Sequence, residues 1–345
     1  MEQQTEEIGM LDLMPHPTFC VENKVITRLN QAARKLFLRE GLSLQPLLES
    51  GSEDYTAFSG GMLYLTLTIH GQRFGASVVR IGQEDVFTLD QQFESAQLRV
   101  LALAARELRG PLANAMLAAQ HLANTAPAAS QLNRSLYQLL RIVGNMSDAS
   151  GVSPVFHPES WNITALFQEI TEKAIALSEP TGIQISYTGP EEACTGCIDQ
   201  QLMERAVLNM ISNALKFTPR GGSIQLALHR SGKQFRFSVS DSGSGMSQQE
   251  QASLFIRYLR EPTVEDTRHG IGLGMLLIRN TAACHRGAVL IDHPQGSGTR
   301  VTITFFSVPP DSASLHSKLL LADYAGEQDH ALVELSEFLP YSFYE

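Results

Sequence analysis

Residues 209–219 decide the fold of this chain and read Asn209-Met210-Ile211-Ser212-Asn213-Ala214-Leu215-Lys216-Phe217-Thr218-Pro219. The apolar spacing predicts an amphipathic helix. Asn209, Asn213 and Lys216 lie at i, i+4 and i+7 and therefore share one face of it. Two amide oxygens and an ammonium group on one face suit a magnesium ion and the phosphates that it neutralises. Taken alone, the pattern also fits an ordinary amphipathic helix, which Pro219 would end.

A second stretch follows a predicted strand and reads Asp241-Ser242-Gly243-Ser244-Gly245. Phe235, Phe237, Val239 and Asp241 alternate along that strand and share one of its faces. A carboxylate at the end of an apolar row is expected to point into a pocket, where it can accept a hydrogen bond from an exocyclic amine such as that of adenine. The two glycines allow a ligand to approach the backbone. The alternative is a surface turn, since Asp and Gly favour turns.

Two further glycine-rich stretches lie towards the C-terminus, Gly270-Ile271-Gly272-Leu273-Gly274-Met275 and Gly296-Ser297-Gly298-Thr299. The first opens a helical pattern, and free N–H groups at a helix N-terminus favour phosphate. The second lies between two strand patterns. Upstream of the first, residues 261–269 are polar and have the composition of a lid. Arg257 and Arg260 precede this stretch and Arg268 lies near its end, and all three can reach phosphates.

In this order and spacing, the four stretches resemble the N, G1, G2 and G3 boxes of the sensor histidine kinase catalytic domain. Phe255-Ile256-Arg257-Tyr258 stands at its F box. The resemblance implies the Bergerat ATP-binding fold, an α/β sandwich, with ATP and Mg²⁺ as cofactors. It implies that Asp241 binds adenine, that Asn209 and Asn213 hold the metal, and that Lys216 meets phosphate. The other nucleotide-binding positions that it implies are Gly243, Gly245, Arg257, Gly270, Gly272, Gly274 and Thr299.

One comparison within the wider superfamily separates kinases from hydrolases. In related ATPases a glutamate activates water four residues before the second asparagine. Asn209 stands at that position here. The sequence is therefore kinase-like rather than hydrolase-like.

The phosphoacceptor box of the same family, His-Glu-Leu-Arg-Thr-Pro-Leu, resembles Arg106-Glu107-Leu108-Arg109-Gly110-Pro111-Leu112. Arg106 stands where the acceptor histidine is expected. A guanidinium group is always protonated and has no lone pair with which to attack phosphate. Glu107 keeps the position of the catalytic base, whereas Gly110 replaces the Thr or Asn that positions water for phosphatase activity. His121 lies fifteen residues further on, about 22 Å along a helix, too far to take the same role.

Three functions are compatible with these motifs. The first is a histidine-kinase-like protein that binds Mg-ATP, cannot phosphorylate itself, and acts as a pseudokinase or as the partner of an intact kinase or a response regulator. The second is an active kinase that phosphorylates a partner protein in trans. The third is a non-catalytic dimeric scaffold in which ATP is structural.

The predicted fold class is multidomain α+β. Residues 1–90 resemble a PAS sensor module, and residues 156–310 form the ATP-binding domain. Residues 91–155 are predicted to form a two-helix hairpin, which pairs with a second copy into a four-helix bundle; a hairpin packed within one monomer is the alternative. Residues 311–345 form a tail whose end has helical apolar spacing and is expected to dock on a neighbouring surface. Each predicted hairpin helix carries one stripe of apolar residues at heptad spacing. On the first helix these are Leu98, Leu101, Ala105, Leu108, Leu112, Ala115, Ala119 and Leu122, and on the second Leu132, Leu136, Leu139, Val143 and Met146.

Charge, hydropathy and cysteine spacing bear on the partners, the location and the metal sites that are expected. The net charge of −10 argues against nucleic acid as a partner. No apolar run approaches the ~20 residues that cross a bilayer, and the acidic start Met1–Glu7 is unlike a signal peptide. A cytoplasmic location is therefore expected. Cys194 and Cys197 have CxxC spacing but lack a second ligand pair for zinc, which favours two reduced thiols in a strand or turn.

Overall fold

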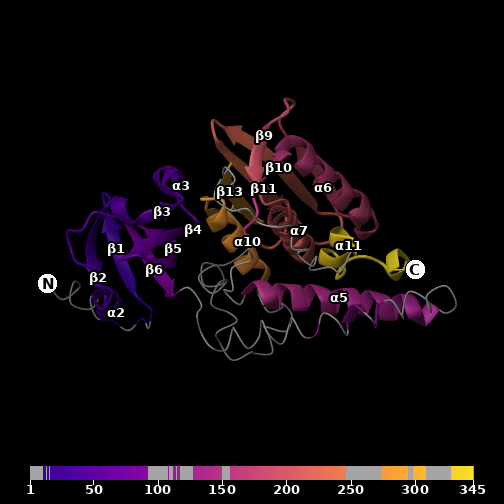
Figure 1. Ribbon diagram of the computed structural model, residues 1–345, viewed down its shortest axis with the longest axis horizontal. Coiled ribbons are helices and arrows are strands. Elements are labelled where there is room, and N and C mark those ends of the chain that lie inside the picture. The colour runs from indigo at the N-terminus through magenta and orange to yellow at the C-terminus, as the bar shows by residue number, and fades with distance from the viewer. Residues whose placement is uncertain are drawn as a thin grey trace.

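A computed structural model describes residues 11–12, 14, 16–91, 108, 112–113, 115–116, 127–149, 156–245, 273–293, 298–307 and 328–344. The residues of the phosphoacceptor box other than Leu108 and Leu112 lie outside this part of the chain, and so do Arg257, Gly270 and Gly272. Figure 1 shows the arrangement of the described elements. None of the helices among these residues has both the length and the hydrophobicity that a membrane crossing requires.

The N-terminal module is an antiparallel sheet with short helices at its edges. Asn30 caps its first short helix, because its Oδ1 accepts a hydrogen bond from the Ala33 N–H at 2.8 Å. Phe19 and Phe87 stack in its core at a centroid distance of 5.1 Å. The elements are β1 (Thr18–Glu22), β2 (Val25–Leu29), α2 (Gln31–Arg34), η1 (Gln45–Leu47), β3 (Leu48–Ser50), α3 (Ser52–Ala57), β4 (Met62–Ile69), β5 (Gln72–Ile81) and β6 (Glu84–Gln91).

The predicted ATP-binding domain, described for residues 156–245, 273–293 and 298–307 and called the catalytic region below, is a two-layer α/β sandwich, as the family resemblance implies. Its helices α6 (Ile163–Ser178), α7 (Gln200–Phe217) and α10 (Leu273–Cys284) pack against the sheet. The helices and the sheet bury a shared aromatic core in which Phe167 contacts Phe237 and Phe305. The strands are β8 (Gln184–Thr188), β10 (Ser223–Ser231), β11 (Gln234–Asp241), β12 (Val289–Asp292) and β13 (Arg300–Phe306). A separate two-stranded sheet pairs β7 (Glu159–Asn162) with β9 (Thr195–Ile198), and η2 (Glu179–Thr181) directly follows α6.

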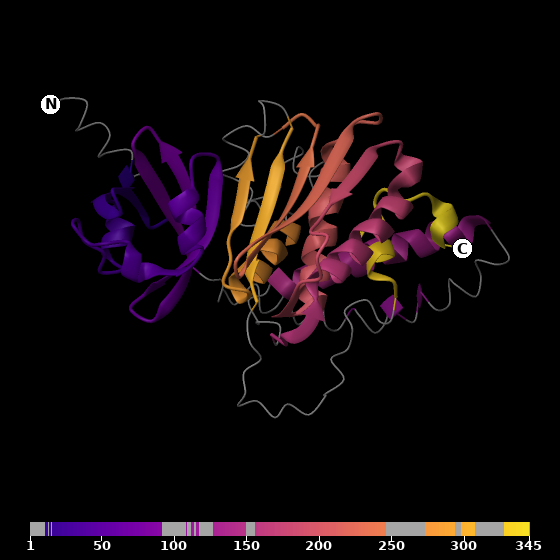
Figure 2. The ribbon, with the colours of Figure 1, turned by 90° about the horizontal axis from the view of Figure 1, so that it is seen from above.

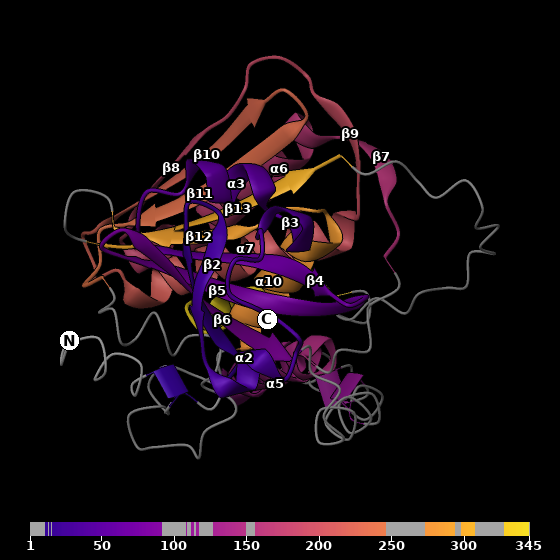
Figure 3. The ribbon, with the colours of Figure 1, turned by 90° about the vertical axis from the view of Figure 1, so that its left-hand side faces the viewer.

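A single sheet runs through both modules (Figure 2). Its order is β2-β1-β6-β5-β4-β12-β13-β11-β10-β8, with β3 beside β4. The junction is the antiparallel pair of β4 and β12, in which Val289 lies opposite Tyr64 and Ile291 opposite Met62. Figure 3, viewed from the N-terminal module, shows the strands of the two modules one behind the other. The sequence motifs indicate two separate modules, and none of them predicts this pairing.

Side chains strengthen the junction beside the strands. The buried carboxylate of Asp54 accepts hydrogen bonds from the Gln234 amide at 3.1 Å and the Thr304 hydroxyl at 2.9 Å. Arg236 lies 3.5 Å from the same carboxylate. Burial raises the pKa of Asp54, and the hydrogen bond from Thr304 and the charge of Arg236 oppose that rise. The N-terminal module thus supplies the acceptor for two polar groups of the catalytic strands.

Replacing Asp54 with alanine is expected to destabilise the junction. The substitution leaves the Gln234 amide and the Thr304 hydroxyl without this acceptor, which costs about 1–3 kcal/mol in the free energy of unfolding. Urea denaturation of Asp54→Ala measures the loss. The neighbouring Glu53 is exposed, so Glu53→Ala is the matched control and should change stability by no more than about 0.5 kcal/mol. Equal stability of both variants would contradict a structural role for Asp54.

Helix α5 (Pro127–Ala149) runs along the catalytic region (Figure 1). The predicted stripe of the second hairpin helix divides between two faces: Leu136 and Val143 are buried, whereas Leu132 and Leu139 are about half exposed. In the first hairpin helix, residues 108, 112–113 and 115–116 are helical, with Leu112 buried and Leu108 exposed. The turn and most of the first helix lie outside the described residues, so the hairpin stays a prediction.

The C-terminal segment, residues 328–344, docks on the catalytic region, as its apolar spacing predicts. It contains α11 (His330–Glu334) and η5 (Tyr341–Tyr344) and lies against α5 and α7. Val333, Leu335 and Leu339 are fully buried in the shared core. Tyr344 packs edge-on against Tyr137 of α5 at 4.9 Å. The segment therefore packs against both α5 and α7.

Candidate functional site

Helix α7 places the predicted metal and phosphate residues on one face. Asp199 caps the helix by accepting a hydrogen bond from the Leu202 N–H at 3.1 Å, and Thr218 ends it just before Pro219. Asn209 is buried, and its Nδ2 donates to the Arg205 carbonyl and to a carboxylate oxygen of Glu334, both at 3.0 Å. The Asn213 amide lies 3.6 Å from the sulfur of Met275 in α10.

Gly274 explains how α10 reaches this face. A Cβ at position 274 would lie 2.6 Å from Oδ1 of Asn209. A side chain at this position would require Asn209 to move, so glycine allows the two helices to approach closely with Asn209 in place. Besides its predicted role in the G2 box, Gly274 therefore has a role in packing. It lets the start of α10 lie against Asn209, which is predicted to hold the metal.

Asp241 and the G1 and G3 residues form a second cluster. Oδ1 of Asp241 accepts hydrogen bonds from the Gly243 N–H at 2.8 Å and from the Thr299 N–H at 3.2 Å. The Asp241 N–H donates in turn to the Thr299 carbonyl at 2.9 Å. A Cβ at Gly298 would lie 1.9 Å from the Asp241 carbonyl oxygen, and Gly245 lies beside Gly298. Residues almost sixty positions apart thus hold one carboxylate in place.

The environment of Asp241 alters its acidity. Burial raises its pKa, and the hydrogen bonds from the Gly243 and Thr299 backbones oppose that rise. A partly desolvated carboxylate with one oxygen held by two N–H groups is a fixed hydrogen-bond acceptor. This is the chemistry that recognition of an amine-bearing base requires.

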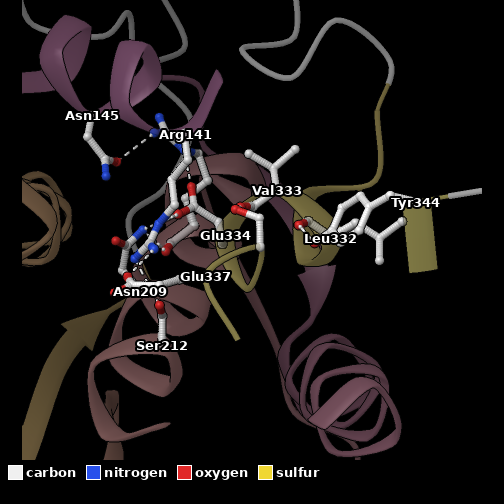
Figure 4. A network of polar contacts seen from close by, with 11 residues as sticks. Arg141, Asn145, Asn209, Ser212, Leu332, Val333, Glu334, Glu337 and Tyr344 are labelled. Carbon is white, nitrogen blue, oxygen red and sulfur yellow. Dashed lines mark hydrogen bonds and ion pairs between the residues drawn. The ribbon is translucent and has the colours of Figure 1, made fainter. Parts of the chain in front are cut away.

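Carboxylates of the C-terminal segment meet the polar face of α7 (Figure 4). Glu334 is fully buried and lies 3.5 Å from Nε of Arg205 and 3.3 Å from Nε of Arg141. Glu337 lies 3.1 Å from Nζ of Lys216 and 3.3 Å from a terminal nitrogen of Arg141. Two acidic side chains of the C-terminal segment therefore bind the residues predicted to hold metal and phosphate.

Four residues of this network were not predicted from the sequence: Arg141, Arg205, Glu334 and Glu337. Arg205 lies four residues before Asn209 and so shares its face, which is a signal that spacing alone provides. Arg141 comes from α5 and also donates to the Ser212 hydroxyl at 2.8 Å. Its role depends on how α5 packs, which local spacing does not encode.

Other predicted features are structural. His285 is buried, its Nε2 accepts a hydrogen bond from the Asp199 N–H at 3.0 Å, and burial lowers its pKa. His285 therefore has a structural role. Cys194, immediately before β9, and Cys197, within it, are free thiols. Within the described ranges, no cluster of three or more His, Cys, Asp or Glu side chains could hold a metal ion.

Comparison with known proteins identifies the catalytic region. Residues 198–309 match the family described as histidine kinase-, DNA gyrase B- and HSP90-like ATPases. The adaptive-response sensory kinase SasA of Prochlorococcus marinus strain SARG is 29% identical over 229 residues, which cover 64% of this chain and 59% of that protein. SasA of Synechococcus sp. strain CC9311 is 28% identical over 276 residues, 78% of this chain and 67% of that protein. The chain is therefore similar to sensor histidine kinases, and its residues 198–309 match an ATPase family that includes histidine kinases.

One solved structure has a fold similar to that of this chain. The crystal structure of full-length ShkA in complex with AMPPNP has a TM-score of 0.50 and 23% identity, and the match covers 62% of this chain and 47% of that one. This likeness concerns the fold. The chain spans about 60% of the length of the first SasA relatives that it matches. The chain is thus related to histidine kinases and contains a Bergerat-type ATPase domain. Strands of this domain belong to the large sheet.

Proposed function

We propose that the chain binds Mg-ATP in the catalytic region and lacks a phosphoacceptor of its own. The observation that carries this proposal is the held carboxylate of Asp241, which faces residues of the G1 and G3 boxes inside the family-matched domain. Asp241 would bind the adenine amine, with Gly243, Gly245 and Thr299 around the base. Asn209 and Asn213 would hold Mg²⁺ through their amide oxygens, and Lys216 would contact phosphate.

The residues present fit this cofactor. Carboxylate oxygens of Glu334 and Glu337 stand beside Asn209 and Lys216, which supports an anion-binding character for this face of α7. The close approach of Gly274 to Asn209 places a helix start beside the same face. When bound, ATP would supply a transferable phosphoryl group. Arg257, Gly270 and Gly272 complete the proposed site, although they lie outside the described residues.

We propose that the chain lacks the residue that would accept the phosphoryl group. Arg106 stands in place of the histidine, and Glu107 at the base position has no neighbouring imidazole to activate. The chain would then signal as a pseudokinase, through nucleotide-dependent conformation or by pairing with an intact kinase or a response regulator. We propose a cytoplasmic location for it.

The proposed domain organisation follows the sequence analysis. Residues 1–90 would be a PAS-like sensor module, 91–155 the dimerisation hairpin, 156–310 the ATP-binding domain and 311–345 a tail. The exposed apolar residues Leu132, Leu139 and Ile142 support a homodimer, because they form a stripe along α5. A second copy packed on this stripe would complete a four-helix bundle.

Incubation with labelled Mg-ATP tests whether the chain lacks a phosphoacceptor. Wild-type protein should carry no acid-labile phosphate after incubation, because a guanidinium cannot accept the phosphoryl group. Arg106→His restores an imidazole beside Glu107 and should gain acid-labile label. Arg106→Lys is the matched control, since a charged ammonium also lacks a lone pair. Phosphohistidine on the wild-type chain would contradict the pseudokinase proposal.

A further inference from the structure

The contacts of Glu334 and Glu337 lie where the proposed function places the metal and phosphates. Asn209 uses its Nδ2 for the Arg205 carbonyl and Glu334, and Lys216 holds Glu337 at 3.1 Å. Arg205 and Arg141 surround the same carboxylates. The C-terminal segment therefore presents two anionic groups to a site that is proposed to receive another anion.

We infer that residues 328–344 are an intramolecular competitor of Mg-ATP, whose carboxylates occupy an anion site formed by Asn209, Lys216, Arg205 and Arg141. The inference rests on the proposed nucleotide binding. It adds a segment of the chain itself as a competing ligand at the site proposed for the phosphates. A triphosphate at the same cations would meet two carboxylates at close range, and like charges at close range repel. Docking of the segment and binding of the nucleotide thus exclude each other.

The burial of Glu334 makes this contact specific. A carboxylate removed from water is costly unless it is paired, and Glu334 is fully buried between two arginines and an amide. Arg205 is buried to a similar degree. When the segment leaves, Arg205 requires another anion or solvent. A phosphate group at this position would meet that requirement.

Helix α5 holds the competing segment in place. Arg134 donates to the Ser336 carbonyl at 2.9 Å and the Glu337 carbonyl at 2.7 Å, and Asn133 donates to the Tyr344 carbonyl at 2.9 Å. Arg141 of the same helix contacts both glutamates. A displacement of α5 relative to α7 would therefore loosen the segment and expose the anion site. The position of α5, which carries the proposed dimer stripe, would in this way affect whether nucleotide can reach the catalytic region.

A pair of substitutions tests the competition in the full chain. Glu334→Gln with Glu337→Gln keeps the side-chain shapes and removes both charges. Equilibrium titration with a fluorescent, non-hydrolysable ATP analogue and Mg²⁺ should show affinity raised by about tenfold or more, because the binding-competent fraction increases. The matched control is Glu169→Gln with Glu172→Gln. These glutamates have the same spacing and are exposed on α6, so affinity should stay within about twofold of wild type.

Amide hydrogen exchange of residues 328–344 in the wild-type chain gives a second readout that needs no substitution. Saturating Mg-ATP analogue should remove the protection of this segment, and the control ligand AMP, which lacks the outer phosphates, should leave it. Unchanged affinity of the doubly substituted chain, or persistent protection at saturation, would overturn the competition while leaving nucleotide binding intact. Weaker binding would overturn it by making Glu334 a metal ligand. Failure of every variant to bind nucleotide would overturn both this inference and the proposed function.

Discussion

Replacing Phe167 with alanine is expected to lower the free energy of unfolding of the catalytic region by about 3–5 kcal/mol. Phe167 of α6 is fully buried and joins the helical layer to the sheet. Its ring stacks on Phe305 of β13 at 5.5 Å and contacts Phe237 of β11 at 5.1 Å. Truncation removes both ring contacts and leaves a cavity that neighbouring backbone cannot fill.

Tryptophan fluorescence during urea denaturation measures this loss. The single tryptophan of the chain, Trp161, lies in β7 next to the start of α6 and so reports on the catalytic region. Phe37→Ala is the matched control, because Phe37 is 72% exposed and its removal should change stability by no more than about 0.5 kcal/mol. A Phe167→Ala variant as stable as wild type would mean that this aromatic cluster does not hold the sandwich together.

Asp241→Asn is expected to weaken binding of Mg-ATP by about 10- to 150-fold. The asparagine keeps Oδ1 as the acceptor for the Gly243 and Thr299 N–H groups, so the local fold should survive. The substitution removes the charge and turns the second oxygen into a donor, which costs the hydrogen bond to an adenine amine. A hydrogen bond to a charged group contributes about 1.5–3 kcal/mol, which corresponds to that range of affinity.

The binding measurement is best made in the wild-type chain and in the chain with Glu334→Gln. Asp241 is held by the G1 and G3 residues rather than by the C-terminal segment, so its loss should appear in both. Because burial raises the pKa of Asp241, binding should weaken on acidification at a higher pH than for an ordinary carboxyl group. Asp12→Asn is the control, since Oδ1 of Asp12 likewise accepts a backbone N–H but lies in the N-terminal module. Equal affinity of Asp241→Asn and wild type would exclude Asp241 as the adenine ligand.

Local spacing predicted the parts of the site that each lie within one element. Helix α7 ends before Pro219 as expected, the alternation of β11 buries Phe235, Phe237 and Val239, and the helical pattern after Gly274 forms α10. These features depend on residues a few positions apart. Their periodicity is therefore present in the sequence itself.

The remaining features depend on contacts between distant segments. The β4–β12 pairing is made by backbone groups, which are the same for every residue, so no motif marks it. The contact between Glu334 and Asn209 joins residues 125 positions apart. Apolar spacing near the C-terminus predicts that the segment docks, but the contacts of its carboxylates with α7 depend on where it docks, which local spacing does not encode.

The joint between β4 and β12 has a consequence for how the chain can be divided. A strand at the edge of a sheet presents unpaired N–H and C=O groups, which promote pairing with other chains. Here β12 ends the catalytic strands with Val289 and Ile291 facing their core, and β4 covers it. A catalytic fragment prepared without the N-terminal strands would expose this edge and tend to self-associate. The N-terminal module thus also covers an edge of the catalytic strands that would otherwise be open to pairing.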